Sequence, residues 1–587
     1  MRFPQMTKQK IRSYPAKKSN MTVVTKRDTC TCTCFSQLSL YYDSFEDDEM
    51  FTYDEITEEL MLARPYRRIM VDPSGSGDKN LSLPMRKSLF AHVPPFIIFH
   101  TNGMCKLPIQ ITRHLFWWQS RKRFVPQIVT HTVRRSGFRI TKDSTANWCG
   151  TWCSTLAYSK LRQPKKFSKV NHFPSSIELG NKISLWRNFR RMRKKFGIND
   201  FDYMPLTFIL PEERENLRKL MQKNGGIWIV KPPNSCAGSG IKIISRLYEI
   251  PNYDSLVVQR YIAWPRLIDG IKFDIRLYVL LTSIDPLRIY VYNEGLVRLA
   301  TIKYVNNVKY LSDRFMHLTN TSVNKVSPNF RPNDNPYKCK GNMWSLNCLW
   351  NYLASMENVD TFKIWTQIKD IAVKTVISAE PSLIRAWKKM SLSTTYNSYQ
   401  LFGFDVLLDN HYRPWLLEVN DFPSMEPDTP LCKIVKGQLA KDYLNLVGFH
   451  VPDILSDKEL KMLRLLYKEH GVCYNRQLYS NMSTWEQKKK QNMFLRKPLR
   501  KFYLKSILRN LTSDDVRVLI RHEDEITQTG RFEKIFPTGT THKYLGFFEE
   551  PRYYNLLLDA WENAYEHDRR KGIERLRQLC KKKYHLS

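Results

Sequence analysis

Residues 401–420, LFGFDVLLDNHYRPWLLEVN, carry oxygen-bearing polar side chains inside two apolar runs. The runs predict two β-strands joined by the polar turn DNHYRP. Glu418 and Asn420 are two residues apart and would point to one face, with Asp405 across the ladder from them. Buried carboxylates side by side repel unless a cation neutralises them, and these oxygen ligands suit Mg²⁺. The alternative is a pair of edge strands whose polar residues face solvent.

A lysine and a glycine-rich turn follow an apolar run in WIVKPPNSCAGSGIKI, residues 228–243. Lys231 ends the run, and Gly238 and Gly240 lie in the turn. Backbone N–H groups of such a turn can hold phosphate, with the ammonium group beside them. The turn matches neither the Walker A loop nor the dinucleotide-binding fingerprint, so alone it is a weak signal.

Two more polar groups lie between these segments. GIKFDIRLYV alternates Lys272, Asp274 and Arg276, which places three charges on one face of an apolar strand. That face is either an outer sheet surface or a cleft for anions and metal. The stretch FMHLTNTSVNK predicts a polar loop that contains His317, Thr319, Asn320, Ser322 and Lys325.

The elements that position these residues are readable from hydrophobic periodicity. Strand signals dominate from 205 to 305, in IWIV, DSLVVQRYI, FDIRLYVLLTS and LRIYVYNEGLVRLAT. Helices are expected at 185–197, 344–357 and 361–377. The helix LWRNFRRMRKKFG aligns Leu185, Phe189, Met192 and Phe196 and is otherwise densely cationic. Thr512, with Asp515 three residues on, predicts the start of another helix.

The composition favours a protein that meets a polyanion. The 587 residues include 93 Lys plus Arg against 56 Asp plus Glu, a formal net charge of +37. The basic start lacks the apolar run of a secretory signal, and no segment reaches the length of a membrane span, so we expect a cytosolic protein. The twelve cysteines do not form a disulfide pattern. Cys30, Cys32 and Cys34, and Cys149 and Cys153, are expected to be free thiols rather than metal ligands.

Composition and pattern divide the chain into four parts. Residues 1–90 are expected to be mostly disordered, and 91–200 to form an N-terminal lobe. Residues 201–450 would form the central and C-terminal lobes, and 455–587 a basic helical region.

Taken in chain order, these motifs resemble those of an ATP-grasp ligase. Lys231 with its glycine turn, QRYI, KFDIR, HLTN and the D…LEVN pair match the tubulin–tyrosine-ligase-like family. The resemblance runs from VNHFPSSIELGNKISLWRN to LEVNDFPSMEPDTPL, and is closest to the polyglutamylase members of the family. RFEKIFP and EEPRYYNLLLDAWE extend it toward the C-terminus. It implies an α+β (α/β) ATP-grasp fold with the nucleotide site between two sheet-containing lobes.

The resemblance also implies roles for individual residues. Lys182 and Lys231 would contact ATP phosphates under a loop that includes Ala237 and Gly238. The rest of the nucleotide site would comprise an adenine pocket and a ribose–phosphate wall, formed by Gln259, Arg260, Tyr261, Ile262, Lys272, Phe273, Asp274, Thr319 and Asn320.

The reacting centre is implied in the same way. Arg276 and Arg298 would be catalytic and hold carboxylates, and Arg298 would bind the incoming glutamate with Ser322 and Lys325. Asp405, Glu418 and Asn420 would coordinate Mg²⁺, with Glu418 able to bridge two ions.

The implied activity is that of an ATP-dependent tubulin glutamylase that forms an isopeptide bond through an acylphosphate. Its partners would be free L-glutamate and the acidic C-terminal tails of tubulin in microtubules, with no membrane or nucleic-acid partner and a monomeric state. It would be cytoplasmic and associated with the cytoskeleton, including cilia or the centrosome. The alternatives are a ligase for glycine or tyrosine, or a microtubule-binding protein with a weakened ATP site.

One position departs from the family pattern. The nucleotide loop normally reads Ala-Arg-Gly-x-Gly-Ile, and Ala237 replaces the arginine here. Alanine cannot supply the bidentate contacts that a guanidinium makes with phosphate or carboxylate. We therefore expect weaker activity unless another basic residue substitutes.

Overall fold

The computed structural model describes most of the chain from residue 85 onward. The described residues are 85–101, 107–120, 125–153, 164–233, 235, 237–251, 255–390, 394, 396–467, 471–480 and 483–587. They belong to one compact unit, residues 69–587. Nearly all of the region expected to be disordered, and the Cys30–Cys34 cluster, lie outside the described residues.

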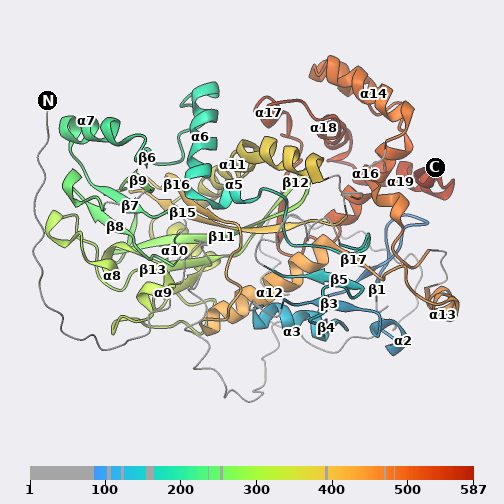
Figure 1. The fold of residues 1–587 in the computed structure, drawn as a ribbon, viewed down its shortest axis with the longest axis horizontal. Helices are drawn as coiled ribbons and strands as arrows, with labels where there is room; N and C mark the ends of the chain where they lie inside the picture. Colours follow the sequence, from blue (N-terminus) through green and yellow to red (C-terminus); the bar gives the residue numbers. More distant parts are fainter. Residues whose placement is uncertain are drawn as a thin grey trace, which may run out of the picture. The chain divides into compact units, whose positions relative to one another are not determined.

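A large antiparallel sheet forms the centre of this unit, in the order β14–β13–β11–β12–β18 (Figure 1). Its long strand β11 (Ile271–Ile284) also pairs with β10 and β15, and β15 pairs with β16. The other members are β10 (Leu267–Ile268), β12 (Leu287–Tyr292), β13 (Leu296–Leu299), β14 (Met343–Ser345), β15 (Gln400–Leu408), β16 (Pro414–Asn420) and β18 (Phe532–Phe536).

Each face of the sheet is covered by a different layer. One face of β11, with Phe273, Ile275 and Leu277, packs into a core formed with α6 (Lys182–Phe196), α10 (Leu346–Met356) and α11 (Thr361–Met390). The other face, at Tyr278 and Leu280, packs against α12 (Pro430–Val447) and α3 (Gln127–Arg135). Figure 1 shows α11 and α12 on opposite sides of β11. Both faces of β11 are therefore largely apolar, and Lys272, Asp274 and Arg276 begin a polar region on the second face.

A smaller antiparallel sheet carries the glycine turn. Its order is β6 (Thr207–Leu210), β9 (Leu256–Arg260), β7 (Trp228–Lys231) and β8 (Lys242–Ile244). Helix α7 (Arg214–Asn224) contributes Leu217 and Met221 to the core of this sheet. Because the turn joins β7 to β8, Lys231 stands at the strand end where the turn begins.

Smaller sheets lie toward the N-terminus of the described chain. The strands β4 (Arg139–Thr141), β3 (Phe116–Trp118) and β5 (Trp148–Thr151) form a parallel sheet. The strands β1 (Met85–Arg86), β2 (Phe96–Ile97) and β17 (Phe449–His450) form an antiparallel one.

The C-terminal region is helical, and it shares the central sheet through β18, which pairs with β12. Most of its helices pack around their own apolar cluster, which includes Trp561, whereas α13 places Leu463 in the cluster that contains Tyr278. They are α13 (Asp457–Tyr467), α14 (Trp485–Arg496), α15 (Arg500–Ser506), α16 (Ser513–Ile526), α17 (His542–Leu545), α18 (Tyr553–Tyr565) and α19 (Arg569–Lys581).

The α+β prediction is confirmed, with two local differences. The helix expected at 361–377 continues through Pro381 to Met390. The polar loop expected at 315–325 contains two short helices, α8 (Arg314–His317) and α9 (Thr321–Asn324), because Asp313 caps the first through its side chain. Thr512 caps α16 in a capping box with Asp515, as predicted.

Two expectations from composition bear on the described residues. Neither Cys149 nor Cys153 forms a disulfide, in agreement with the prediction, and both side chains are buried. A search of the helices within the described ranges finds none long and apolar enough to cross a bilayer.

Candidate active site

The site is built on the polar stretch of β11. Lys272, Asp274 and Arg276 alternate along it and share one face, so the sheet presents three charges in a row. Strand pairing adds two more charges in register, since Asp274 lies opposite Arg298 of β13 and Arg276 lies opposite Asp405 of β15. Four of these side chains thereby meet from three strands.

These four form a continuous ladder of ion pairs. Arg298 donates from Nε and Nη2 to the two oxygens of Asp274, at 2.7 and 2.6 Å. Its Nη2 lies 3.0 Å from Oδ2 of Asp405. Arg276 donates to both oxygens of Asp405, with Nη2 2.9 Å from Oδ2. Arginine forks match carboxylates in this bidentate geometry, which fixes the position of all four groups.

Burial and charge act in opposite directions on the ladder. Burial alone would raise the pKa of Asp405, but Arg276 and Arg298 outweigh it and hold that pKa far below its usual range. Burial alone would lower the pKa of Arg298, but Asp274 and Asp405 raise it well above its usual value. Asp405 and Arg298 therefore keep their charges at neutral pH although little of their surface meets water.

The predicted oxygen ligands meet at the edge of this ladder. Asp405 pairs directly with Glu418, as expected from the hairpin. A register shift follows, because Val406 pairs with Leu416, so that both Leu416 and Val419 reach the apolar core. This β-bulge turns Glu418 toward the polar face. Without it, Glu418 would lie on the same apolar face as Leu416, two residues earlier.

The donor set fits a magnesium ion completed by other ligands. Asp405 and Glu418 supply carboxylate oxygens and Asn420 supplies its amide Oδ1, while both oxygens of Asp405 also pair with arginines of the ladder. No cluster of three or more His, Cys, Asp or Glu side chains suited to a metal occurs among the described residues. Mg²⁺ commonly binds through one or two carboxylates plus waters and substrate phosphates, so this partial set is sufficient.

Lys231 stands opposite the carboxylates at the end of β7. Its ammonium donates to Oε1 of Gln259 at 2.8 Å, and Nε2 of Gln259 donates to Thr207 at 3.0 Å. Burial lowers the pKa of Lys231 to about 8, although the charges of Glu418 and Asp405 oppose this shift. Lys182 adds to the lowering, and its Nζ lies 3.5 Å from Oε2 of Glu418 and 2.9 Å from the Ser235 carbonyl.

Lys272 provides a third cation of the same kind. It donates to the Tyr261 hydroxyl and to the His317 carbonyl, both at 2.9 Å. Burial lowers the pKa of Lys272 to about 7, with Asp274 opposing and Lys231 adding to the shift. Burial also lowers the pKa of His317 to about 4, so its Nδ1 bonds Tyr261 as a neutral ring at 2.9 Å.

The glycine turn is attached to the segment that contains Thr319 and Asn320. The Ser322 hydroxyl donates to the Ala237 carbonyl at 3.0 Å, and Arg314 Nη2 donates to the Gly238 carbonyl at 3.1 Å. Ala237 and Gly238 both have positive φ, +57° and +76°. A Cβ at Gly238 would lie 2.9 Å from Val323 Cγ2, so glycine is required there for space as well as for backbone conformation.

Other predicted residues lie nearby with different surroundings. Arg260 turns its guanidinium onto the Gly225 carbonyl and the Trp228 ring. Phe273 is fully buried in the core on the opposite face of β11, so its side chain does not reach the site. Ile262 is half-buried, Thr319 is buried, and Lys325 is exposed. Asn320 lies beside Gly238, 3.2 Å from the position of an added Cβ.

Sequence reasoning missed two contributors. Arg314 contacts the glycine turn, and Thr207 contacts Gln259. Both contacts join residues far apart in the sequence, so no local pattern predicts them. The basic character of Arg314 just before HLTN was a possible signal.

Comparisons with known proteins agree with the motif order. Residues 159–458 match the model of the tubulin-tyrosine ligase family. The chain is 40% identical over 535 residues to the human tubulin monoglutamylase TTLL4, covering 90% of this chain and 44% of that protein. It is 42% identical over 511 residues to the mouse protein of the same name, covering 85% of this chain and 42% of the relative. It is also 36% identical over 506 residues to the Caenorhabditis elegans tubulin polyglutamylase ttll-4, covering 85% of this chain and 80% of that protein.

The chain thus spans less than half the length of the mammalian relatives and most of the nematode one. The resemblance to the polyglutamylase members of the family and the ATP-grasp assignment are confirmed.

The glycine turn gives a first prediction. Gly238→Ala should weaken ATP binding by about tenfold or more, because the new Cβ meets Val323 and alanine is disfavoured at this φ. Nucleotide titration calorimetry measures the loss. Ser239→Ala, at the exposed neighbouring position, is the matched control and should bind ATP as the parent does. Equal affinities for the two variants would contradict this role for Gly238.

The buried lysines give a second prediction, on pH. Phosphate binds the protonated amines, and the pKa values of Lys231 and Lys272 are about 8 and 7. ATP affinity should therefore fall as pH rises from about 7 to 9, by up to about tenfold per unit for each lysine above its pKa. Calorimetry in buffers of different ionisation enthalpy should show proton uptake on binding. Lys231→Met should reduce that uptake, and a pH-independent affinity in the parent would exclude the model.

Proposed function

The chain belongs to the tubulin–tyrosine ligase family, and from that premise we propose that it is an ATP-dependent tubulin glutamylase. It would join the amino group of glutamate to a Glu side chain in the tubulin C-terminal tail by an isopeptide bond. The observation that carries the proposal is the convergence of Lys182 and Lys231 with Asp405 and Glu418, below a glycine turn.

The reaction has two steps. An oxygen of the acceptor carboxylate attacks the γ-phosphorus of ATP, and the bond from that phosphorus to ADP breaks. The glutamate amine then attacks the carbonyl carbon of the acylphosphate, loses a proton, and phosphate leaves as the amide forms. A free carboxylate would not react with the amine, because its oxygen is a poor leaving group.

The lysines supply electrostatic stabilisation for the first step. Negative charge spreads over the transferring phosphoryl oxygens in the transition state, where fixed cations stabilise it most. Gln259 and Thr207 hold the Lys231 ammonium, while Tyr261 and the His317 carbonyl hold that of Lys272. Because these amines are already oriented and largely desolvated, little reorganisation is required when phosphate arrives.

Magnesium would be held by Asp405, Glu418 and Asn420, whose donor atoms fit it. When bound, it would neutralise phosphate charge beside the lysines.

The arginine ladder suits the amino-acid donor. Arg276 and Arg298 use Nε and Nη2 toward Asp405 and Asp274, and the described residues offer no partner for Nη1 of either. These two groups can bind a carboxylate of glutamate without breaking the ladder. Positioning the amine in this way accelerates attack by proximity. Ser322, whose hydroxyl bonds the Ala237 carbonyl, would contribute to this pocket through the loop.

Two cationic segments, α6 and residues 488–505, are candidates for contact with acidic tubulin tails, and their environments differ. On α6, Arg187, Arg190, Arg191 and Arg193 each form an ion pair with a carboxylate of this chain. Around α14 and α15 the exposed cations have no acidic partner within ion-pair distance among the described residues; they are Lys488, Lys489, Arg496, Lys497, Lys501 and Lys505. The second surface is therefore better suited to an external polyanion.

Microtubules would localise the enzyme to the cytoskeleton, including cilia or the centrosome. A monomer is sufficient, because every residue assigned to the reaction comes from one chain.

The proposal is tested by a ligation assay. Microtubules are incubated with the protein, ATP and labelled glutamate, glycine or tyrosine. We expect incorporation of glutamate only, and its loss in Glu418→Gln, which keeps the side-chain volume but removes the charge. No incorporation of any amino acid, with microtubule binding intact, would contradict an enzymatic function and favour a binding protein with a weakened ATP site. Incorporation of glycine or tyrosine instead of glutamate would show that the protein is a ligase for that amino acid.

Ala237 gives a separate prediction for the same assay. Ala237→Arg should raise turnover by up to about tenfold, because a guanidinium there adds charge-assisted contacts to phosphate or carboxylate. Ala237→Gln, long but neutral, is the matched control and should give no gain. An unchanged rate in both would show that this position contributes no needed cation.

A further inference from the structure

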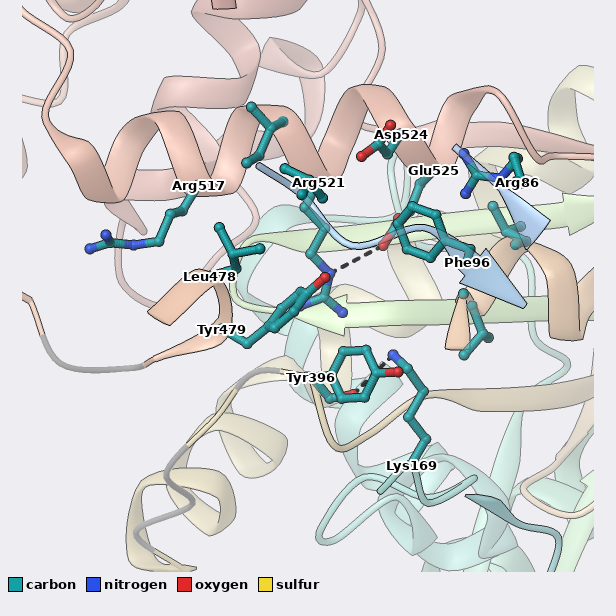
Figure 2. Close-up of a pocket in the computed structure, with 15 residues that line it drawn as sticks. Arg86, Phe96, Lys169, Tyr396, Leu478, Tyr479, Arg517, Arg521, Asp524 and Glu525 are labelled. Atoms are coloured by element: carbon teal, nitrogen blue, oxygen red, sulfur yellow. Dashed lines mark hydrogen bonds and ion pairs between the residues drawn. The ribbon is translucent and has the colours of Figure 1, made fainter. Parts of the chain in front are cut away.

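A second polar cavity lies away from the active site and shares no lining residue with it. It has a volume of about 20 Å³ and lies between β1 and β2, the C-terminal end of α12, the segment with Leu478 and Tyr479, and helix α16. Figure 2 shows polar side chains from these elements converging on it. Its charged lining residues are Arg86, Lys169, Arg517, Arg521, Asp524 and Glu525.

Lys169 is the least compensated charge in this cavity. Its side chain is buried, with 1% exposed. Among the described residues its ammonium has one hydrogen-bond acceptor, the Tyr396 carbonyl at 3.0 Å, and it lies 3.5 Å from the centre of the Tyr396 ring. An ammonium has three donors, and Figure 2 shows this one pointing into the cavity below Tyr479.

The nearby carboxylates are already engaged by other groups. Asp524 accepts hydrogen bonds from the Ser88 hydroxyl and the Leu89 amide, at 2.6 and 2.9 Å. Glu525 accepts from Thr282 and Tyr290 and pairs with Arg288 at 3.0 Å and with Arg521 at 3.5 Å.

Counting charges leaves the cavity positive. Arg517 is paired with Asp514, which removes both from the balance. Three lining cations, Arg86, Lys169 and Arg521, then face the two carboxylates of Asp524 and Glu525, and Glu525 is also paired with Arg288 outside the lining.

The histidine behind the lining residue Tyr479 is affected by the same positive charges. His450 bonds the Tyr479 hydroxyl at 2.5 Å and the Pro95 carbonyl at 3.0 Å. Burial lowers the pKa of His450 to about 3, and Lys169, Arg86 and Arg521 add to that shift. Burial also lowers the pKa of Lys169 well below its usual value, with Arg521 and Arg288 contributing. A buried excess of positive charge is costly unless an anion is present.

We propose that this cavity binds one small inorganic anion, no larger than phosphate, through Lys169 and the neighbouring arginines. The anion would accept hydrogen bonds from the remaining N–H groups of Lys169 and balance the local positive charge. Since the cavity walls come from segments far apart in the sequence, binding would stabilise their packing.

The test uses the whole protein with the active site saturated by ADP, so that added anions do not report on that site. Chloride, sulfate and phosphate are each titrated at constant ionic strength against gluconate, which is too large for the cavity. At least one should raise the unfolding midpoint by about 1–2 °C in a saturable way. Titration calorimetry should give a stoichiometry of one.

Lys169→Met, which keeps the length of the side chain without its charge, should lose this shift. Lys223→Met, the same change at an exposed position at the end of α7, should retain it. A shift that is equal in both variants, or that does not saturate, would overturn the proposal. If Lys169→Met does not fold, bromide soaked into crystals of the parent protein decides the question: anomalous density beside Lys169 supports the site, and its absence excludes it.

Discussion

The ladder Arg276–Asp405–Arg298–Asp274 is the constraint on which the rest of the site depends. Four charged groups from three strands are buried in one layer, where an unpaired charge would be costly and a paired one is fixed in place. The register between β11, β13 and β15 sets the pairing, so the sheet and the charges specify each other. A shift of one residue in the pairing of β11 with β13 or with β15 would send Arg298 or Asp405 to the apolar face.

Strand β11 separates structure from chemistry by its alternation. Phe273, Ile275 and Leu277 face the core under α11, while Lys272, Asp274 and Arg276 face the site. The same polar face becomes apolar at Tyr278 and Leu280, where α12 covers it. The site therefore occupies the polar end of this face, and the apolar end of the strand, which packs against α12, anchors it. Two lysines on neighbouring elements complete the site: Lys231 is the last residue of β7, and Lys182 is the first residue of α6.

Much of this arrangement could be predicted from local sequence pattern, and the features that could not be predicted depend on tertiary contacts. Period-two alternation predicts the face of KFDIR, and the hairpin predicts that Asp405 meets Glu418. Alternation does not predict the bulge that keeps Leu416 and Val419 in the core while Glu418 turns to the site, because the bulge depends on the partner strand. The partners Arg314 and Thr207, and the addition of β18 to the sheet, are tertiary contacts without a local signature. Phe273 was grouped with its neighbours by motif, although its parity places it in the core.

The contacts of the glycine turn clarify what the missing arginine changes. Ser322 and Arg314 hold the turn through the carbonyls of Ala237 and Gly238, which every residue type possesses. The conformation of the turn also depends on Gly238, which is retained, and on a left-handed position at 237 that alanine occupies here. Replacement of arginine by Ala237 thus removes one cation and leaves the attachment of the turn intact. Lys182, Lys231 and Lys272 remain as the lysines proposed to bind phosphate, so the change reduces the local charge without dismantling the site.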